Sequence, residues 1–487
     1  MHQSAPSVRP RVLHLAQPVD GGVARVVRDL VRAQLAAGLP VTVGCPGGAL
    51  AADLRELGAE VRDWSARRSP GPGLPGEVRR LARLVAEVRP ELVHAHSAKA
   101  GLAARLALRG RVPTVYQPHA WSFEAAGGLT GALALRWERW GARWADRVVC
   151  VSEAERVTGV RAGVRAAYAV VPNGVDTARF APGPVAPPLP RAAGGPDRPL
   201  VVCVGRLCRQ KGQDVLLRAW DTVLGTLPRA RLALVGDGPD REALRLRAHP
   251  SVEFAGAVAD VLPWYRAADL VVLPSRWEGM ALAPLEALGC GRPVVLTDVD
   301  GARESLPPAL AERCLVPPED AGSLARVITA LLSDPPLRAA LGDQGRRHVV
   351  SRHDVRQTAA RITTVYAGLL APATKPSAGP GRPSLARGGA ADGPARNSGT
   401  RRPAPAERTP PRSGEPHHPA PTEPGPAGRP APPGPDPGAT HRPPSAERGE
   451  AGRSTSAERG TAGRPAPADG SAPRRPVPAQ CRECSRP

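Results

Sequence analysis

Short apolar runs alternate with stretches of helical periodicity along most of this chain. In the first half the runs lie at residues 11–16, 41–45, 92–96, 114–117, 148–152 and 169–171. In the second half they lie at residues 200–205, 231–236, 270–274, 293–297 and 313–316. Continuous apolar runs are typical of parallel strands that are buried on both faces. Their alternation with helices predicts an α/β protein with doubly wound parallel sheets.

The length of this patterned region predicts two domains, because residues 8–370 exceed the size of one ordinary hydrophobic core. Residues 177–199 are rich in Pro, Gly and Ala, which is typical of a linker. We therefore expect an N-terminal Rossmann-like domain at residues 8–176, an interdomain linker at 177–199 and a second domain at 200–350.

The composition changes abruptly after residue 370. The last 117 residues hold 27 of the 59 prolines and no Phe, Trp or Tyr. Such a segment buries too little apolar surface to offset the entropy lost on ordering. We predict a disordered tail at residues 371–487.

The net charge of +21 is spread along the whole chain, and the tail holds 18 basic and 10 acidic residues. This distribution and the absence of aromatic residues from the tail argue against a nucleic-acid partner. Peripheral contact with an anionic membrane is the preferred interpretation of the positive charge. Scattered cysteines and the lack of an 18-residue apolar run predict a cytoplasmic protein without a transmembrane span.

Two carboxylates and a cationic loop are the candidate functional features of the second half. Glu278 follows the run at 270–274, and Glu286 lies about two helical turns further on. Carboxylates at the carboxyl end of a strand suit the paired hydroxyls of a sugar or ribose. The loop after 200–205 contains Arg206 and Lys211, and Lys211 is one of only three lysines in the chain. A cationic loop between a strand and a helix N-terminus favours an anion.

These motifs resemble the retaining glycosyltransferases of family 4, whose two-domain fold is called GT-B. The resemblance rests on G-R-L-x-x-x-K-G, V-G-D-G-P and E-x7-E in the second half. In the first half it rests on Gly21-Gly22, on P-H-A-W around His119 and on P-N-G-V-D around Asn173. It implies two Rossmann-like domains that face a cleft, with a final helix at 355–369 that crosses back onto the first domain.

The resemblance also implies an enzyme that transfers a sugar from a UDP- or GDP-sugar with retention, by same-face attack and without a metal or other cofactor. The implied catalytic residues are His119, Arg206, Lys211 and Glu278. The implied donor-binding residues are Gly21, Gly22, Asn173, Arg206, Lys211, Gly236, Gly279, Met280, Ala281 and Glu286. Plain alternatives are a tight turn for the two glycines, a core histidine for His119 and a solvated charge for Lys211.

The motif H-S-x-K-A-G at residues 96–101 resembles members that act on polyprenyl-diphosphate-linked sugars. We predict that Ser97, as a helix N-cap, and Lys99 bind a phosphate of a saccharide or lipid-linked acceptor. The alternative is a capped helix with an exposed lysine. The two histidines before the motif, His94 and His96, also suggest a metal site, although no third ligand is evident in the sequence.

Several alternatives remain open. Asp298 and Asp300 form a D-x-D that suits either a metal–diphosphate site or a polar turn. Trp137, Trp140 and Trp144 lie either against the sheet or on a lipid surface, with the sheet preferred. A nucleotide-sugar epimerase of the same fold or a non-catalytic scaffold with a Pro-rich tail would be alternative functions. The first turn lacks the G-x-G-x-x-G of a dinucleotide-binding dehydrogenase.

Overall fold

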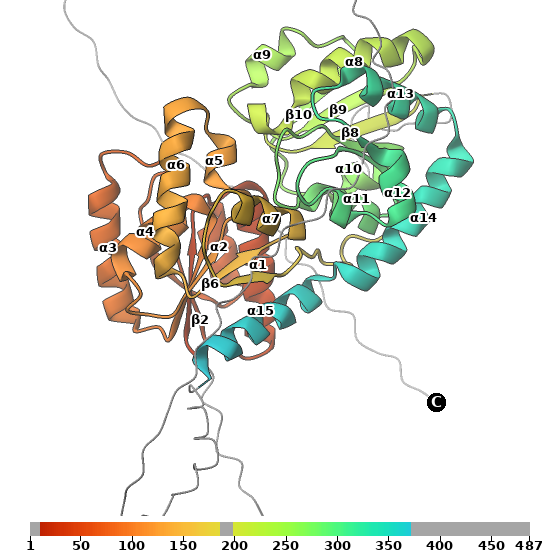
Figure 1. The fold of residues 1–487 in the computed structure, drawn as a ribbon. Coiled ribbons are helices and arrows are strands. Elements are labelled where there is room, and N and C mark those ends of the chain that lie inside the picture. Colours follow the sequence, from red (N-terminus) through yellow and green to blue (C-terminus); the bar gives the residue numbers. More distant parts are fainter. Residues whose placement is uncertain (1–9, 186–197, 372–487) are drawn as a thin grey trace, which may run out of the picture. The chain divides into compact units, whose positions relative to one another are not determined.

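The computed structural model describes residues 10–185 and 198–371, and within them two parallel β-sheets with flanking helices (Figure 1). The first sheet has seven strands in the order β3-β2-β1-β4-β5-β6-β7. These strands are β1 (Val12–Ala16), β2 (Val41–Cys45), β3 (Glu60–Asp63), β4 (Leu92–His96), β5 (Thr114–Gln117), β6 (Arg147–Cys150) and β7 (Tyr168–Val170). The predicted tail lies, except for Ala371, outside the described residues.

Helices pack on both faces of the first sheet because successive residues of each strand point to opposite sides. Leu13 and Leu15 face α3 and α4, while Val12 faces α1 and α15. The helices of this half are α1 (Gly21–Ala36), α2 (Ala49–Glu56), α3 (Leu74–Val88), α4 (Ser97–Leu108), α5 (Ser122–Ala125), α6 (Gly128–Gly141) and α7 (Glu153–Arg161), with a 3-10 turn at Ala142–Trp144.

The second sheet has six parallel strands in the order β10-β9-β8-β11-β12-β13. They are β8 (Leu200–Val204), β9 (Arg231–Val235), β10 (Val252–Gly256), β11 (Leu270–Leu273), β12 (Val294–Thr297) and β13 (Leu315–Val316). The helices are α8 (Gln213–Thr226), α9 (Arg241–Arg245), α10 (Leu262–Ala267), α11 (Leu282–Gly289), α12 (Pro308–Cys314), α13 (Ala321–Leu332), α14 (Pro335–Arg352) and α15 (Val355–Leu370), with 3-10 turns at Arg209–Lys211 and Arg303–Ser305. Both sheets therefore have the predicted doubly wound α/β architecture.

The structure differs from the sequence prediction at three places. The strands β3 and β10 were not predicted, and each lies at the edge of its sheet. Three of the four residues of β3 are exposed, so this strand lacks an apolar run. The predicted strand at 313–316 begins too early, because Arg313 and Cys314 end α12.

The order of the strands reverses between β1 and β4 in the first sheet and between β8 and β11 in the second. In open α/β sheets, ligands bind beyond the carboxyl ends of the strands at such a reversal. Gly21 follows β1, Ser97 follows β4, Arg206 follows β8 and Glu278 follows β11. The topology therefore brings most candidate residues to the two reversal points.

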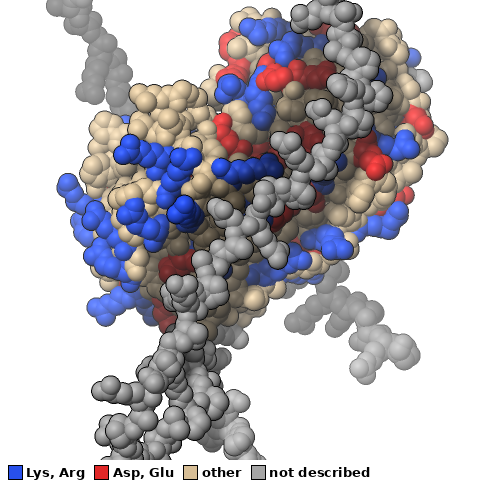
Figure 2. Space-filling model, viewed as in Figure 1, with Lys and Arg blue, Asp and Glu red and all other residues tan. Residues whose placement is uncertain are grey.

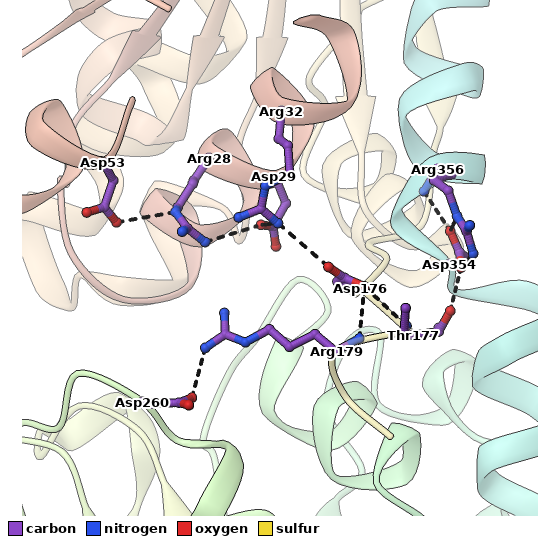
Figure 3. A network of polar contacts seen from close by, with 11 residues as sticks. Arg28, Asp29, Arg32, Asp53, Asp176, Thr177, Arg179, Asp260, Asp354 and Arg356 are labelled. Carbon is purple, nitrogen blue, oxygen red and sulfur yellow. Dashed lines mark hydrogen bonds and ion pairs between the residues drawn. The ribbon is translucent and has the colours of Figure 1, made fainter. Parts of the chain in front are cut away.

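The helix α15 returns from the second sheet to the first (Figure 1), where Ile362 and Tyr366 pack against β1 and β4. The start of α15 is tied to the end of the predicted N-terminal domain and to the first residue of the predicted linker. Thr177 donates its hydroxyl hydrogen to Asp354 at 2.5 Å, and Val175 pairs with the backbone of Asp354. Figure 3 shows this junction, in which Arg32 of α1 also pairs with Asp176 at 3.7 Å.

Candidate active site

A cavity of about 230 Å³ contains most of the predicted site residues. Its lining includes loops after β1, β5, β8 and β11 together with the first turn of α11. The predicted residues that line it are Gly21, Gly22, His119, Asn173, Arg206, Lys211, Glu278, Gly279, Met280, Ala281 and Glu286. Gly236 is not among them, because it packs beneath the β8 loop, where an added Cβ would lie 2.1 Å from the carbonyl oxygen of Gly205.

The loop between β8 and α8 presents two cations of different character. Arg206 is exposed, and its side chain has no hydrogen-bond or ion-pair partner among the residues that the structure describes. Gln213, the first residue of α8, donates its side-chain amide to the Arg206 carbonyl at 2.9 Å. Gly212 has φ +65°, and an added Cβ would lie 2.0 Å from the carbonyl oxygen of Pro274. Glycine is therefore required where this loop crosses the end of β11.

Lys211 is paired, in contrast to Arg206. Its Nζ lies 2.5 Å from Oε1 of Glu278, and Ser275 donates its hydroxyl hydrogen to the same oxygen at 2.7 Å. The exposed fractions of the two charged side chains are 19% and 11%. A ligand anion at this loop therefore meets one unpaired guanidinium and one ammonium that already has a carboxylate partner.

Glu286 is fully buried and connects the two halves of the cleft. Arg25, from the first turns of α1, forms an ion pair with its Oε1. Tyr265 donates its hydroxyl hydrogen to Oε2 at 2.7 Å. Burial raises the pKa of Tyr265 well above its usual range, so this hydroxyl remains a donor. A ribose that approaches Glu286 would share the carboxylate with these two partners.

The glycines at the start of α1 leave open space beside the cavity. An added Cβ at Gly21 or Gly22 would have no neighbour within 4 Å among the described residues, and Gly21 has φ +66°. The backbone of this turn is thus accessible to a ligand in the cleft. The plain tight-turn interpretation fits the same φ.

His119 lies on a turn with unusual backbone geometry, since His119 has φ +58° and Ala120 has φ +100°. Glu155 holds this turn by accepting the N–H groups of Ala120 at 2.7 Å and Val151 at 2.6 Å. Burial raises the pKa of Glu155 to about 7 and lowers the pKa of His119 to about 3. His119 is therefore neutral at physiological pH.

The predicted acceptor residues have different surroundings from those expected. Lys99 is buried, and its Nζ lies 2.6 Å from Oε2 of the buried Glu77. Ser97 donates its hydroxyl hydrogen to the carbonyl of Gln17. The predicted N-cap role of Ser97 is wrong, because Ser97 is the first helical residue and His96 occupies the cap position. The alternative of a capped helix with an exposed lysine is also wrong, because Lys99 is buried, and a role of Ser97 and Lys99 in acceptor binding stays a prediction.

His94 and His96 lie in a buried cluster with His14 of β1. One ligand nitrogen from each of the three lies within 4.8 Å of the others, so the set has the composition of a metal site. Hydrogen bonds engage every ring nitrogen of these three histidines except His94 Nε2, which is buried without a hydrogen-bond partner among the described residues. His14 Nδ1 and His96 Nε2 lie 3.0 Å apart, and His94 Nδ1 lies 2.5 Å from the hydroxyl of Tyr366.

The two aspartates of the D-x-D motif have separate partners. Asp298 pairs with Arg303 at 2.5 Å, and Asp300 accepts the hydroxyl of Thr158 at 2.6 Å. The second of these contacts joins α7 to the loop after β12. A polar turn accounts for both side chains.

Sequence reasoning missed Arg25, Glu155 and His14. Arg25 follows Gly21-Gly22 by one helical turn, so its spacing places it at the same helix end. Glu155 offers the weak signal of a carboxylate three residues after a Ser that starts a helix, and Ser152 does cap α7. His14 stands inside an apolar run, where a buried polar residue implies a partner.

The tryptophan-rich helix α6 has an exposed apolar side. The exposed fractions are 79% for Leu129, 60% for Leu133 and 43% for Trp140. The rings of Trp140 and Trp144 lie 4.3 Å apart, with Arg143 above Trp140 at 4.5 Å. The preferred prediction, that the three tryptophans pack against the sheet, is wrong for Trp140. No helix in the described part of the chain is both long and apolar enough to cross a membrane.

Comparison with known proteins agrees with this architecture. Residues 20–179 match the family described as Glycosyltransferase Family 4, and residues 198–334 match Glycosyl transferases group 1. A lipopolysaccharide core biosynthesis mannosyltransferase of Rhizobium meliloti is 31% identical over 252 residues, which cover 48% of this chain and 69% of that protein. A GDP-mannose-dependent phosphatidylinositol monomannoside mannosyltransferase of Mycolicibacterium smegmatis is 36% identical over 240 residues, covering 46% of this chain and 63% of that protein.

The fold itself matches solved structures. The crystal structure of HepE from Anabaena, in complex with UDP and glucose, superposes with a TM-score of 0.64 at 23% sequence identity. The match covers 74% of this chain and 100% of that chain. The fold is therefore GT-B, as the sequence motifs indicated. The chain belongs to glycosyltransferase family 4.

Proposed function

We propose that this protein transfers a hexose from a nucleotide-sugar donor to a saccharide or lipid-linked acceptor, with retention of anomeric configuration. The observation that supports it most is the cleft in which the unpaired Arg206 and the open Gly21-Gly22 turn lie with the buried carboxylate of Glu286. Cationic groups and a helix N-terminus suit a diphosphate, and carboxylates suit sugar hydroxyls.

In the proposed reaction, the bond between the sugar C1 and the diphosphate oxygen breaks while the acceptor oxygen bonds to C1 on the same face. The acceptor's proton passes to the leaving phosphate oxygen. Arg206 and Lys211 stabilise the negative charge that develops on that phosphate. His119, which is neutral, contacts the donor sugar and does not act as the general base.

GDP-mannose is the first donor to test, because several of the curated relatives are mannosyltransferases and four of these are named as dependent on GDP-mannose. The purified chain would be incubated with GDP-mannose, UDP-glucose and UDP-galactose, with and without lipid-linked acceptors. Release of nucleotide diphosphate with a new α-linked product supports the proposal. An epimerised nucleotide sugar in place of transfer would favour the epimerase alternative.

We propose that no divalent cation takes part. The leaving group has Arg206, Lys211 and the α8 N-terminus available, and Asp298 and Asp300 are engaged by Arg303 and Thr158. Turnover in EDTA should equal turnover in Mg²⁺. A strict requirement for Mg²⁺ or Mn²⁺ would contradict this part of the proposal.

We further propose that α6 contacts an anionic membrane and so brings the cleft to a lipid-linked acceptor. The exposed Leu129, Leu133 and Trp140 supply apolar area, and exposed arginines of α6 and the turn after it supply positive charge. In Figure 2, basic residues gather on the half of the molecule that holds α3 to α6.

Vesicle sedimentation tests this contact. Leu133→Ser should weaken binding to vesicles that contain phosphatidylglycerol, whereas Leu246→Ser should not. Leu246 is a matched control because it is 80% exposed but lies in the second half of the fold. Equal binding of both variants would contradict the assignment of α6.

A further inference from the structure

A continuous chain of hydrogen bonds runs from α1 through the core of the first sheet to the cleft. Gln34 Oε1 lies 2.8 Å from His14 Nε2, and His14 Nδ1 lies 3.0 Å from His96 Nε2. His96 Nδ1 lies 3.3 Å from His119 Nε2. We call these four residues the histidine chain. Gln34, His14 and His96 are buried, and His119 is half-buried and lines the cavity.

The strand register produces this alignment. In the parallel pairing of β1 and β4, His14 lies beside His94 and Ala16 lies beside His96. His14, His94 and His96 therefore face the same side of the sheet, which α1 and α15 cover. Gln34 from the last turns of α1 reaches this face from above. The strand register thus places the ring of His14 next to the ring of His96, and His96 in turn contacts His119 at the cleft.

The orientation of the Gln34 amide decides the proton positions along the chain. With its oxygen facing His14 Nε2, as in this structure, His14 carries its proton on Nε2 and accepts at Nδ1. His96 must then donate from Nε2 and accept at Nδ1, which leaves His119 as the donor from Nε2. Burial lowers the pKa of His14 to about 4 and that of His96 well below its usual value, so each ring has a single proton.

These proton positions determine the hydrogen-bonding role of the second ring nitrogen of His119, Nδ1. Its Nδ1 has no hydrogen-bond partner within residues 10–185 and 198–371. With the proton held on Nε2, Nδ1 is an acceptor in the cleft. A hydroxyl of a bound sugar is a donor that fits this nitrogen.

We propose that His14 and His96 are positioning residues that fix His119 in the Nε2–H tautomer, so that its Nδ1 accepts a hydrogen bond from a hydroxyl of the donor sugar. The sugar contact rests on the proposed function, but the tautomer does not. A purely structural cluster would be equally well served by apolar side chains, since buried polar groups cost stability unless each one is satisfied. The strained turn at His119 and Ala120 adds to this cost at the end nearest the cleft.

The tautomer can be measured without any activity. The full-length chain has 11 histidines, which makes ¹⁵N labelling of histidine side chains practical. The His119 signals are identified by their loss in His119→Asn. We expect a protonated Nε2 and an unprotonated Nδ1 that do not change between pH 8 and pH 6. A proton on Nδ1 in the unsubstituted protein would overturn the proposal even if sugar transfer is confirmed.

Two substitutions at His96 separate positioning from simple packing. His96→Leu removes the acceptor for His119, whereas His96→Asn keeps an amide oxygen near the position of Nδ1. We expect His96→Leu to lower kcat/KM for the donor about tenfold, roughly the effect of one lost hydrogen bond. His96→Asn should recover most of this loss and restore the single tautomer of His119. Equal losses in both variants, with His119 unchanged in both spectra, would mean that His96 serves packing only.

Ile362→Val is the matched control. It shortens a buried apolar side chain on the same side of the sheet and leaves the hydrogen bonds of the histidine chain in place. We expect no change in the His119 tautomer or in kcat/KM. Elemental analysis of the protein purified without chelators tests the competing arrangement. One equivalent of transition metal that is lost in His14→Leu would overturn the proposal, because metal ligation would replace these hydrogen bonds.

Discussion

At the scale of single residues, Arg206 and Lys211 lie on the same loop but in different electrostatic surroundings. Arg206 is exposed and unpaired within the described residues, so its charge is available to a ligand at no cost to the fold. Lys211 neutralises Glu278, which is nearly buried. Removal of Lys211 would leave that carboxylate without its counter-charge, and an unpaired buried charge lowers the free energy of unfolding.

The two cations should therefore respond differently to substitution by alanine. Arg206→Ala should lower kcat/KM roughly 10²-fold and leave the melting temperature unchanged. Lys211→Ala should cause a comparable loss and also reduce the free energy of unfolding by about 2 kcal/mol. Arg209→Ala is the control on the same loop, since Arg209 faces Trp277 and does not line the cavity. Wild-type turnover in Arg206→Ala would rule out this phosphate site.

Four histidines with lowered pKa values give the protein a defined dependence of stability on pH. Folding lowers the pKa of His14 to about 4 and of His119 to about 3, and it lowers the pKa values of His94 and His96 well below 6.5. Each contributes stability that is present above pH 6.5 and is lost as the pH falls toward its folded value, because only the unfolded chain takes up the proton. Glu155 acts in the opposite direction, since its folded pKa is raised to about 7.

We therefore expect the free energy of unfolding to decrease between pH 6.5 and pH 4.5. Each neutral histidine contributes a slope of about 1.4 kcal/mol per pH unit. Denaturant titrations at half-unit intervals would measure the total. His119→Asn should reduce the slope of the unfolding free energy against pH by about 1.4 kcal/mol per pH unit, the share of one histidine. The free energy of unfolding should still decrease as the pH falls. A flat profile over this range would mean that the histidines are accessible to protons in the folded state.

At the scale of elements, position in the sheet decides how visible a strand is in the sequence. Central strands such as β1 and β8 are buried on both faces and were predicted from their apolar runs. The edge strands β3 and β10 have partly or fully exposed residues, so their composition resembles that of loops. The start of a helix depends on a capping residue beside it in the sequence and not on its place in the sheet. For example, α15 begins one residue after the N-cap Asp354.

Asp354 should matter beyond its own helix because it also holds the linker. Its carboxylate accepts the N–H of Arg356 at 2.8 Å and the hydroxyl of Thr177 at 2.5 Å. Asp354→Ala should reduce the free energy of unfolding by about 2 kcal/mol, more than the ~1 kcal/mol typical of a cap alone. Asp334→Ala is the control, since Asp334 caps α14 at 2.9 Å from Leu337 N but lies away from the linker. Equal losses would mean that Thr177 adds nothing.

The pH dependence of this contact has a definite sign. The hydrogen bonds from Arg356 and Thr177 lower the pKa of Asp354 to about 2. The contribution of the Asp354 carboxylate to the free energy of unfolding is thus complete above pH 3.8 and disappears as the pH falls toward 2. In denaturant titrations, the difference between the unsubstituted protein and Asp354→Ala should accordingly shrink over that interval.

At the scale of the whole molecule, the sequence predicts local patterns of strands, helices and motifs better than contacts between residues that are far apart in the chain. The strand-and-helix alternation and the E-x7-E spacing are local, so they were readable. The partners of those glutamates were not, because Arg25 is 261 residues from Glu286 and Lys211 is 67 residues from Glu278. The histidine chain joins β1 to β4 across 82 residues and depends on strand register. Long-range pairing of this kind leaves no pattern within a single segment.

The final helix sets the boundary of the fold and supports a prediction about truncation. Ala359, Ile362 and Tyr366 of α15 are buried against strands and α1 of the first sheet, and α15 ends at Leu370. A chain that stops at Ala371 should keep its melting temperature within a few degrees and its donor turnover, because this apolar interface stays complete. Binding to anionic vesicles should weaken, since the removed residues contribute +8 of the net charge.

A chain that stops at Arg352 is the informative counterpart of this truncation. It lacks α15 and the Asp354 contact, and it would expose Val12, Leu30 and Leu92 to water. Loss of one buried Ile and one buried Tyr alone removes roughly 4 kcal/mol of burial free energy, a large share of the stability of an ordinary domain. We expect this shorter chain to be insoluble or unfolded by circular dichroism. If instead the cut at Ala371 lowers the melting temperature by more than a few degrees, residues beyond α15 contribute to the fold, and the domain boundary at residue 370 must be moved.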